Sequence, residues 1–245
     1  MRIMEKFMQK ARDNWNAAPV TLAFLGDSVT QGCFELYIKN DGLHETVFDK
    51  HSAYHQYLFE MLNVLYPSVP VNIINAGVSG GSAPHGLERL ERDVLSHKPD
   101  LVVVCFGLND ACQGRENLSR YLDALSAIFD KVRASGSDLI FMTPNMMGTC
   151  VSCHLTDPRL RAIAERMIPF QTEGDLDYYM DAVRRLCRDK RVTLCDCYAK
   201  WKQMEKYGVD TTDLLSNYIN HPTRTMNRLF AVSLLETMMQ EDPYE

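Results

Sequence analysis

The chain has 245 residues and a mass of 28.0 kDa, with 46% hydrophobic and 24% charged residues. These values are ordinary for a globular protein and exclude disordered, collagen-like and disulfide-scaffold chains. Lys and Arg number 26 against 32 Asp and Glu, a net charge of −6, so we expect neither nucleic acid nor an anionic membrane as a partner. No repeat or linker-like change of composition divides the chain, and we expect a single domain over residues 1–245.

The N-terminal segment, residues 1–16, alternates charged and apolar residues and therefore predicts a short amphipathic helix rather than a signal peptide. No apolar run approaches the ~18 residues that a membrane span requires. The eight cysteines lie largely in apolar, strand-like runs, as Cys105 and Cys195 do, which favours reduced thiols. We expect a cytoplasmic protein, and the sequence leaves the oligomeric state open.

Short apolar runs rich in β-branched residues predict five buried parallel strands, at residues 20–25, 71–75, 101–106, 138–142 and 192–195. Between them, apolar residues at helical spacing predict helices over 84–97 and 118–134, and a further helix is expected at about 225–240. Strands that alternate with helices imply a parallel sheet covered on both faces, hence a three-layer α/β sandwich.

Two stretches, at about 32–54 and 146–177, are too long for plain connections and show no strong periodicity. Loops of this length in a compact domain are usually lids or binding walls. We therefore expect both to be irregular loops that form substrate walls or a lid.

Polar and glycine residues follow the predicted strands, at the sheet edge where α/β proteins bind ligands. Ser28 follows the first strand, Gly77 the second and Asn109 the third, and His221 precedes the C-terminal helix. A hydroxyl, a glycine N–H, a side-chain amide and an imidazole are the parts of a serine acyl hydrolase.

In this order and at strand ends, Gly26-Asp27-Ser28, Gly77, Gly107-x-Asn109-Asp110 and His221-Pro222 resemble the sequence blocks of the SGNH (GDSL-type) hydrolase superfamily. The resemblance implies a flavodoxin-like sheet of about five strands in the order 2-1-3-4-5, ester hydrolysis through an acyl-serine intermediate, and no metal or organic cofactor.

By the same resemblance, Ser28 is the nucleophile and His221 the general base. The Ser28 and Gly77 N–H groups and the Asn109 amide form the oxyanion hole. Three further residues are expected to hold these loops by hydrogen bonds, namely Asp27, Asn75 and Asp110.

One position departs from the family pattern, because Tyr218 stands where an aspartate usually precedes the histidine by three residues. That aspartate holds the imidazole tautomer in serine hydrolases. The open candidates to replace it are a backbone carbonyl near Asn217, the Asn217 amide, Asp213 and, less favoured, Asp196. A slow Ser–His dyad is a further alternative.

Three motifs compete with this interpretation. Ser79 lies in a G-x-S-x-G pattern after a strand, but a nucleophile there would leave Ser28 and Asn109 without a role. Cys150-x-x-Cys153-His154 has the spacing of a haem attachment site or half a zinc site, and Cys195-x-Cys197 does not complete it. His51 and His55 lack a third ligand nearby, so we expect no metal.

The expected substrate is a small soluble ester, such as a short-chain or acetylated carbohydrate ester, because the acidic chain has no amphipathic membrane anchor. His85, close after Gly80-Gly81, is a candidate to line the site. A thioesterase or acyltransferase would use the same residues. A carbohydrate- or partner-binding protein with weak or no turnover is the non-enzymatic alternative.

Overall fold

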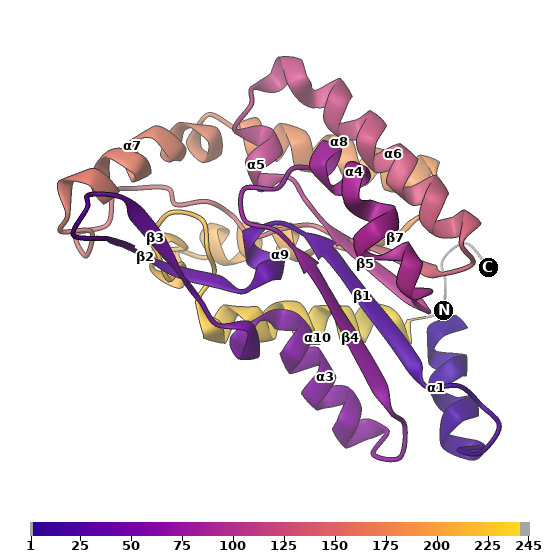
Figure 1. Cartoon of the computed structure of the whole chain (residues 1–245). Helices are drawn as coiled ribbons and strands as arrows, with labels where there is room; N and C mark the ends of the chain where they lie inside the picture. The colour runs from indigo at the N-terminus through magenta and orange to yellow at the C-terminus, as the bar shows by residue number, and fades with distance from the viewer. Residues whose placement is uncertain (1, 241–245) are drawn as a thin grey trace.

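The structure is a computed structural model that describes residues 2–240. Its centre is an all-parallel sheet in the order β4-β1-β5-β6-β7 (Figure 1). Numbered among themselves along the chain, these five strands have the order 2-1-3-4-5, which confirms the predicted fold class. Their bounds are β1 Val20–Gly26, β4 Val71–Gly77, β5 Leu101–Cys105, β6 Asp138–Met142 and β7 Thr193–Cys195.

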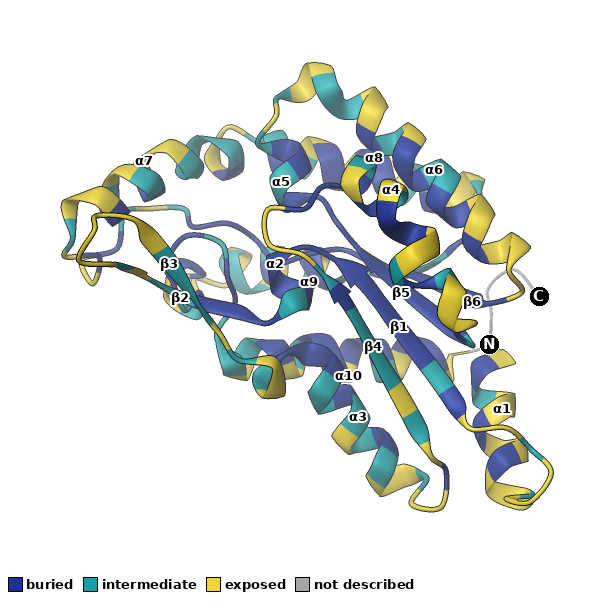
Figure 2. Ribbon diagram, in the orientation of Figure 1, coloured by how far each residue is buried: buried dark blue, intermediate teal, exposed yellow. Residues whose placement is uncertain are grey.

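Helices cover both faces of the sheet (Figure 1). One layer contains α1 (Arg2–Arg12), α3 (Tyr54–Leu65), α9 (Cys197–Lys206) and α10 (Arg224–Met239). The other contains α4 (Ala83–Asp93), α5 (Leu108–Ala111), α6 (Leu118–Ala134) and α8 (Asp175–Asp189). The central strands lie between these layers, and every residue of β5 is buried (Figure 2).

Helix α6 has the predicted bounds because its apolar residues form one continuous buried face. Tyr121, Leu125, Ile128 and Val132 lie on that face, at the spacing of a helix packed on a sheet. The helix predicted over 84–97 is shorter, since α4 ends at Asp93 and a separate 3₁₀ turn follows at Leu95–His97. Helix α10 begins one residue earlier than predicted, where Thr223 caps it by accepting from the Met226 N–H.

The prediction of irregular loops is wrong for most of both stretches, because both contain regular structure, although no helix or strand lies between Met142 and Pro158. Their role as substrate walls or a lid stays a prediction. Residues 32–54 form an antiparallel hairpin of β2 (Cys33–Ile38) and β3 (His44–Phe48), followed by a 3₁₀ turn at Lys50–Ser52. Residues 146–177 include α7 (Pro158–Thr172) and the start of α8.

The hairpin packs on α7, and α7 also packs on α8, but each buries only a small part of its surface, which explains why their periodicity is weak. Figure 1 shows them together at one side of the molecule, beside the carboxyl ends of the strands. Their contact is a small second apolar cluster, centred on Leu155, Leu160, Ala164 and Ile219. Because only one narrow stripe of each element is buried, neither shows the strong pattern of a core helix or strand. No helix within residues 2–240 is long and apolar enough to cross a membrane.

Candidate active site

Ser28 begins α2 (Ser28–Gln31), directly after β1. Asp27 caps this short helix, since its Oδ1 accepts a hydrogen bond from the Val29 N–H at 2.9 Å. The chain turns sharply at Gly26, where an added Cβ would lie 2.1 Å from Thr30 Oγ1 and 2.8 Å from the Cys105 carbonyl oxygen. Only glycine fits there, and the turn places Ser28 at the carboxyl edge of the sheet.

The structure brings Ser28 and His221 together although 193 residues separate them. His221 Nε2 lies 3.0 Å from Ser28 Oγ. On the other side of the ring, His221 Nδ1 lies 2.8 Å from the carbonyl oxygen of Phe34, which is in β2. A carbonyl only accepts hydrogen bonds, so Nδ1 carries the proton and Nε2 is left to accept from the serine hydroxyl. This is the tautomer that a general base needs.

The contact with Phe34 corrects the prediction of which group orients the imidazole. The group is a backbone carbonyl, but it belongs to Phe34 and not to a residue near Asn217. Asn217 instead holds the backbone of the loop, since its Oδ1 accepts from the Ile219, Asn220 and His221 N–H groups at 2.9–3.0 Å. Asp196 pairs with Arg184 and caps α9. Asp213 makes no hydrogen bond to His221 within the described part of the chain. The predicted candidates lie near His221 in the sequence or at a strand end, whereas the observed partner lies in a hairpin 187 positions away.

Tyr218, at the position where the resemblance would place an aspartate, has a left-handed backbone conformation with φ 56°. Its ring stacks on His154 at a centroid distance of 5.3 Å and an interplanar angle of 25°. The side chain therefore packs against the 148–155 segment and takes no part in the hydrogen bonds of His221.

The Gly77 N–H, predicted as an oxyanion donor, is already used in a hydrogen bond. It donates to Asn75 Oδ1 at 2.9 Å, while Asn75 Nδ2 donates to the Gln31 carbonyl oxygen at 3.3 Å. An added Cβ on Gly77 would lie 2.2 Å from Gln31 N. Glycine is needed here because β4 passes close to α2, and the prediction of an oxyanion role for Gly77 is wrong.

A free glycine N–H occurs three residues later, at Gly80, which has φ 74°. No group among residues 2–240 accepts a hydrogen bond from the N–H of Gly80 or of Ser28. Asn109 Nδ2 donates to the Gly81 carbonyl oxygen at 2.8 Å, so the amide lies against the same turn. The sequence signal for this donor was the Gly80-Gly81 pair, which allows a backbone with positive φ.

None of the competing motifs has, among the described residues, the partners that its proposed chemistry requires. Ser79 is exposed, and no imidazole within residues 2–240 lies at hydrogen-bond distance from it. Cys150 and Cys153 are exposed free thiols, and no group of three or more His, Cys, Asp or Glu side chains in this range could hold a metal ion. His55 is buried, with Nε2 at 3.2 Å from the Thr30 carbonyl oxygen.

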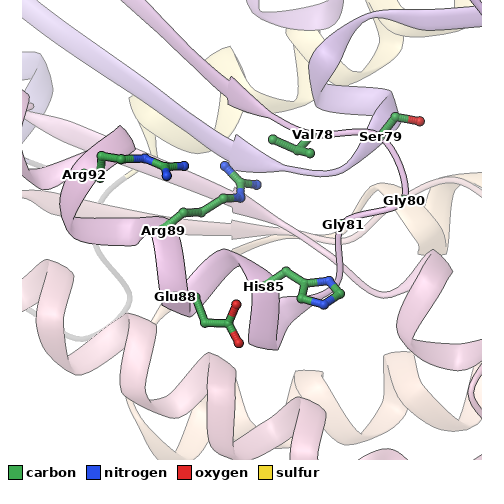
Figure 3. A pocket seen from close by; sticks show the side chains of 8 residues that line it. All are labelled: Val78, Ser79, Gly80, Gly81, His85, Glu88, Arg89 and Arg92. Atoms are coloured by element: carbon green, nitrogen blue, oxygen red, sulfur yellow. The ribbon is translucent and has the colours of Figure 1, made fainter.

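A cavity of about 410 Å³ lies beside the Gly80-Gly81 turn. Figure 3 shows its wall along α4, from His85 next to Gly81 to Arg92 at the far end. Charged and polar side chains of α4 contribute to its lining, which consists of Val78, Ser79, Gly80, Gly81, His85, Glu88, Arg89 and Arg92. His85, which the sequence placed near the site, lines this cavity and not the Ser28–His221 contact.

Two buried carboxyl groups flank the site. Asp27 is 1% exposed and Asp110 3% exposed, and each has one oxygen without a partner among the described residues. Asp110 Oδ1 accepts from the Ala83 N–H at 2.9 Å and so holds α4. Burial raises the pKa of Asp27 to about 7, with a further contribution from the charge of Asp110, and burial raises the pKa of Asp110 to about 6.

Because the pKa of Asp27 is raised in the folded chain, we expect the free energy of unfolding to fall as pH rises from about 4 to about 7. The pKa is 3.8 without the influence of the fold and about 7 in the folded chain, so the stabilisation is complete below 3.8 and is lost as pH rises through about 7. Asp27→Asn mimics the neutral carboxyl and keeps an acceptor for the Val29 N–H. We expect its free energy of unfolding to exceed the natural protein's by on the order of 1–3 kcal/mol at about pH 8, and the two to converge near pH 4.

Urea unfolding across this pH range measures the difference. Asp123→Asn, on the exposed face of α6, is the matched control and should follow the natural protein at every pH. Parallel pH curves for the natural protein and Asp27→Asn would contradict the assignment.

Comparison with known proteins shows which family the chain resembles. A sequence model of the GDSL-like Lipase/Acylhydrolase family matches residues 24–229. An acetylxylan esterase of Geobacillus stearothermophilus is 24% identical over 193 residues, which cover 76% of this chain and 79% of that protein.

Solved structures share the fold. The acetylxylan esterase Axe2 from Geobacillus stearothermophilus has a TM-score of 0.66 at 21% identity, covering 91% of this chain and 95% of that one. A two-domain esterase active on acetylated mannans has a TM-score of 0.68 at 17% identity; the match covers 96% of this chain but only 52% of that one. Since the family match spans most of the chain, this protein belongs to the GDSL-like lipase/acylhydrolase family.

Proposed function

We propose that this ester hydrolase removes acetyl or other short acyl groups from a small carbohydrate through an acyl-Ser28 intermediate. The observation that carries the proposal is the chain of contacts from Ser28 Oγ to His221 Nε2 at 3.0 Å and from His221 Nδ1 to the Phe34 carbonyl at 2.8 Å. The carbohydrate substrate is supported by the relatives, an acetylxylan esterase and an esterase active on acetylated mannans.

In the proposed reaction, His221 Nε2 takes the proton of Ser28 as Oγ attacks the ester carbonyl. The same nitrogen then gives the proton to the leaving alcohol, and a water molecule repeats both steps on the acyl-enzyme. Burial lowers the pKa of His221 below its ordinary value of 6.5, while the hydrogen bond to Phe34 and the charge of Glu35 oppose this change. The imidazole is therefore neutral at neutral pH and ready to act as the base.

The proposed oxyanion hole consists of the Ser28 N–H, the Gly80 N–H and the Asn109 amide. The two backbone groups have no acceptor among residues 2–240. The Asn109 amide has two hydrogens, and only one is used in the bond to Gly81. Because Gly80 and Gly81 are adjacent, that bond also holds the turn that carries the Gly80 donor.

Asn109→Ala is expected to lower kcat by on the order of 10²–10³-fold, the usual cost of one oxyanion donor. The expected loss falls on kcat more than on KM, since the donor stabilises the transition state. Hydrolysis of p-nitrophenyl acetate measures both constants. Asn72→Ala is the control, because the Asn72 amide bonds Thr21 Oγ1 at the opposite end of β4. An Asn109→Ala variant with the same kcat as Asn72→Ala would contradict the proposed role.

A panel of substrates tests the proposed specificity. Acetate release from acetylated xylo-oligosaccharides is expected, and among p-nitrophenyl esters the rate should be highest for acetate and low at about eight acyl carbons. The physical reason is that Glu88, Arg89 and Arg92 line the cavity beside the oxyanion turn, where their charged groups suit sugar hydroxyls and disfavour a long acyl chain. A rate that rises beyond eight carbons would contradict the short-acyl preference.

The same panel separates the alternatives. A faster reaction with an acetyl thioester, or acetyl transfer to an added alcohol in place of water, would identify a thioesterase or an acyltransferase. A binding protein without turnover would give equal rates for the natural protein and Ser28→Ala.

A further inference from the structure

Arg224, the first residue of α10, lies three residues after His221 and connects it to the hairpin. Its Nη1 donates to Glu35 Oε1 at 2.5 Å and its Nη2 to Glu35 Oε2 at 3.2 Å. Its Nε donates to Asp49 Oδ2 at 3.0 Å. The guanidinium carbon also lies 4.3 Å from the centroid of the Phe34 ring. One side chain therefore contacts the residue whose carbonyl bonds the imidazole and two carboxylates around it.

The hairpin pairing does not by itself hold the Phe34 carbonyl. Cys33 pairs with Phe48 and Leu36 with Thr46, so β2 has one residue more than β3 between these pairs, which is a β-bulge. Phe34 and Glu35 occupy the bulge. The hairpin is also a separate two-stranded sheet, an arrangement of marginal stability on its own. Something outside the hairpin must hold the bulge.

Arg224 holds the bulge from outside the hairpin, because it forms ion pairs at both strands. Glu35 belongs to the bulge in β2, and Asp49 directly follows β3, so the two ion pairs close the hairpin at the end nearest to His221. The guanidinium also lies over the Phe34 ring, so it contacts the residue whose carbonyl bonds His221. The negative charge of Glu35 also favours the charged form of the nearby His221.

We propose that Arg224 is a positioning residue for ester hydrolysis, which fixes the bulge of β2 and thereby the Phe34 carbonyl that orients His221. The inference rests on the proposed function of Ser28 and His221. Arg224, Phe34 and Glu35 together then perform what an aspartate three residues before the histidine does elsewhere: they hold one tautomer and place one negative charge near the ring.

The test compares Arg224→Met with Arg228→Met. Arg228 lies one helical turn further along α10, with its guanidinium carbon 4.7 Å from the Tyr57 ring centroid, and it forms no ion pair among the described residues. Both substitutions remove an arginine that stacks on an aromatic ring, but only the first releases the hairpin. The Arg224 and Glu35 side chains are 38% and 42% exposed, so loss of their ion pair should loosen the bulge locally while the chain as a whole still folds. The Arg228→Met variant should fold as well, since Arg228 lies on the exposed side of α10.

For Arg224→Met we expect kcat for p-nitrophenyl acetate to fall on the order of 10–10²-fold, with KM little changed, because misplacing a catalytic group slows the chemical step. Arg224→Lys should recover part of the loss, since it retains the charge but bonds fewer oxygens. Arg228→Met should keep the natural kcat. An unchanged kcat in Arg224→Met, or an equal loss in Arg228→Met, would overturn the proposal.

A second measurement does not depend on turnover. In ¹⁵N spectra of the histidine ring, the natural protein and Arg228→Met should show His221 protonated at Nδ1, and Arg224→Met should show a mixture of tautomers. If the natural protein hydrolyses no ester, the proposed function fails while this measurement still tests the positioning. If Arg224→Met keeps a single Nδ1–H tautomer while Ser28→Ala is inactive, only the role of Arg224 is excluded.

Discussion

Replacement of Ser28 by alanine is expected to lower the rate of p-nitrophenyl acetate hydrolysis by about 10³-fold or more, because the variant has no nucleophile. The variant loses only a hydroxyl. The turn at Gly26 and the Asp27 cap of α2 do not involve the Ser28 side chain, so the fold should be retained. What remains is the weak catalysis provided by the oxyanion donors and by binding.

Fluorophosphonate labelling provides the second readout. The natural protein should be labelled at Ser28, and Ser28→Ala should not be labelled. Ser79→Ala is the control, because Ser79 lies on the neighbouring turn, follows a strand and is exposed, but has no imidazole within reach among residues 2–240. Labelling of Ser79, or loss of activity in Ser79→Ala alone, would reverse the assignment.

The second large effect is expected for His221→Ala, which should lower kcat by on the order of 10³–10⁴-fold because Ser28 then has no base. His97→Ala, an exposed histidine in the 3₁₀ turn after α4, is the control and should keep full activity. Circular dichroism of both variants verifies that the fold is retained. An active His221→Ala would contradict the mechanism.

The pH profile of the natural protein tests the same base. Only neutral imidazole accepts a proton, so kcat/KM falls as pH decreases through the pKa of His221. Burial lowers that pKa below 6.5, and the acid limb should therefore lie below pH 6.5. An acid limb above this value would mean that the carbonyl of Phe34 and the charge of Glu35 outweigh burial, the opposite of the balance described above.

The elements that carry the sheet could be predicted closely from local patterns. The bounds predicted for helix α6 and strand β6 are the observed ones, because a short, mostly apolar run or a complete amphipathic face depends only on residues near in sequence. The hairpin at 33–48 and α7 were missed, since each has only a narrow buried stripe and thus little periodicity. An element that buries few residues outside the main core therefore shows little apolar periodicity in its sequence.

The sequence by itself determined the five strands and the sheet edge at which Ser28 and Asn109 lie, because runs of apolar residues and the glycines after them act locally. The strand order and the role of His221 followed from the resemblance to the SGNH hydrolases. Two features were decided only by the tertiary structure: the Phe34 carbonyl as the partner of His221, and Gly80 rather than Gly77 as the glycine with a free N–H. Both depend on which donors and acceptors remain unpaired once distant segments pack together. A hydrogen bond between residues 187 positions apart leaves no periodic trace in the chain.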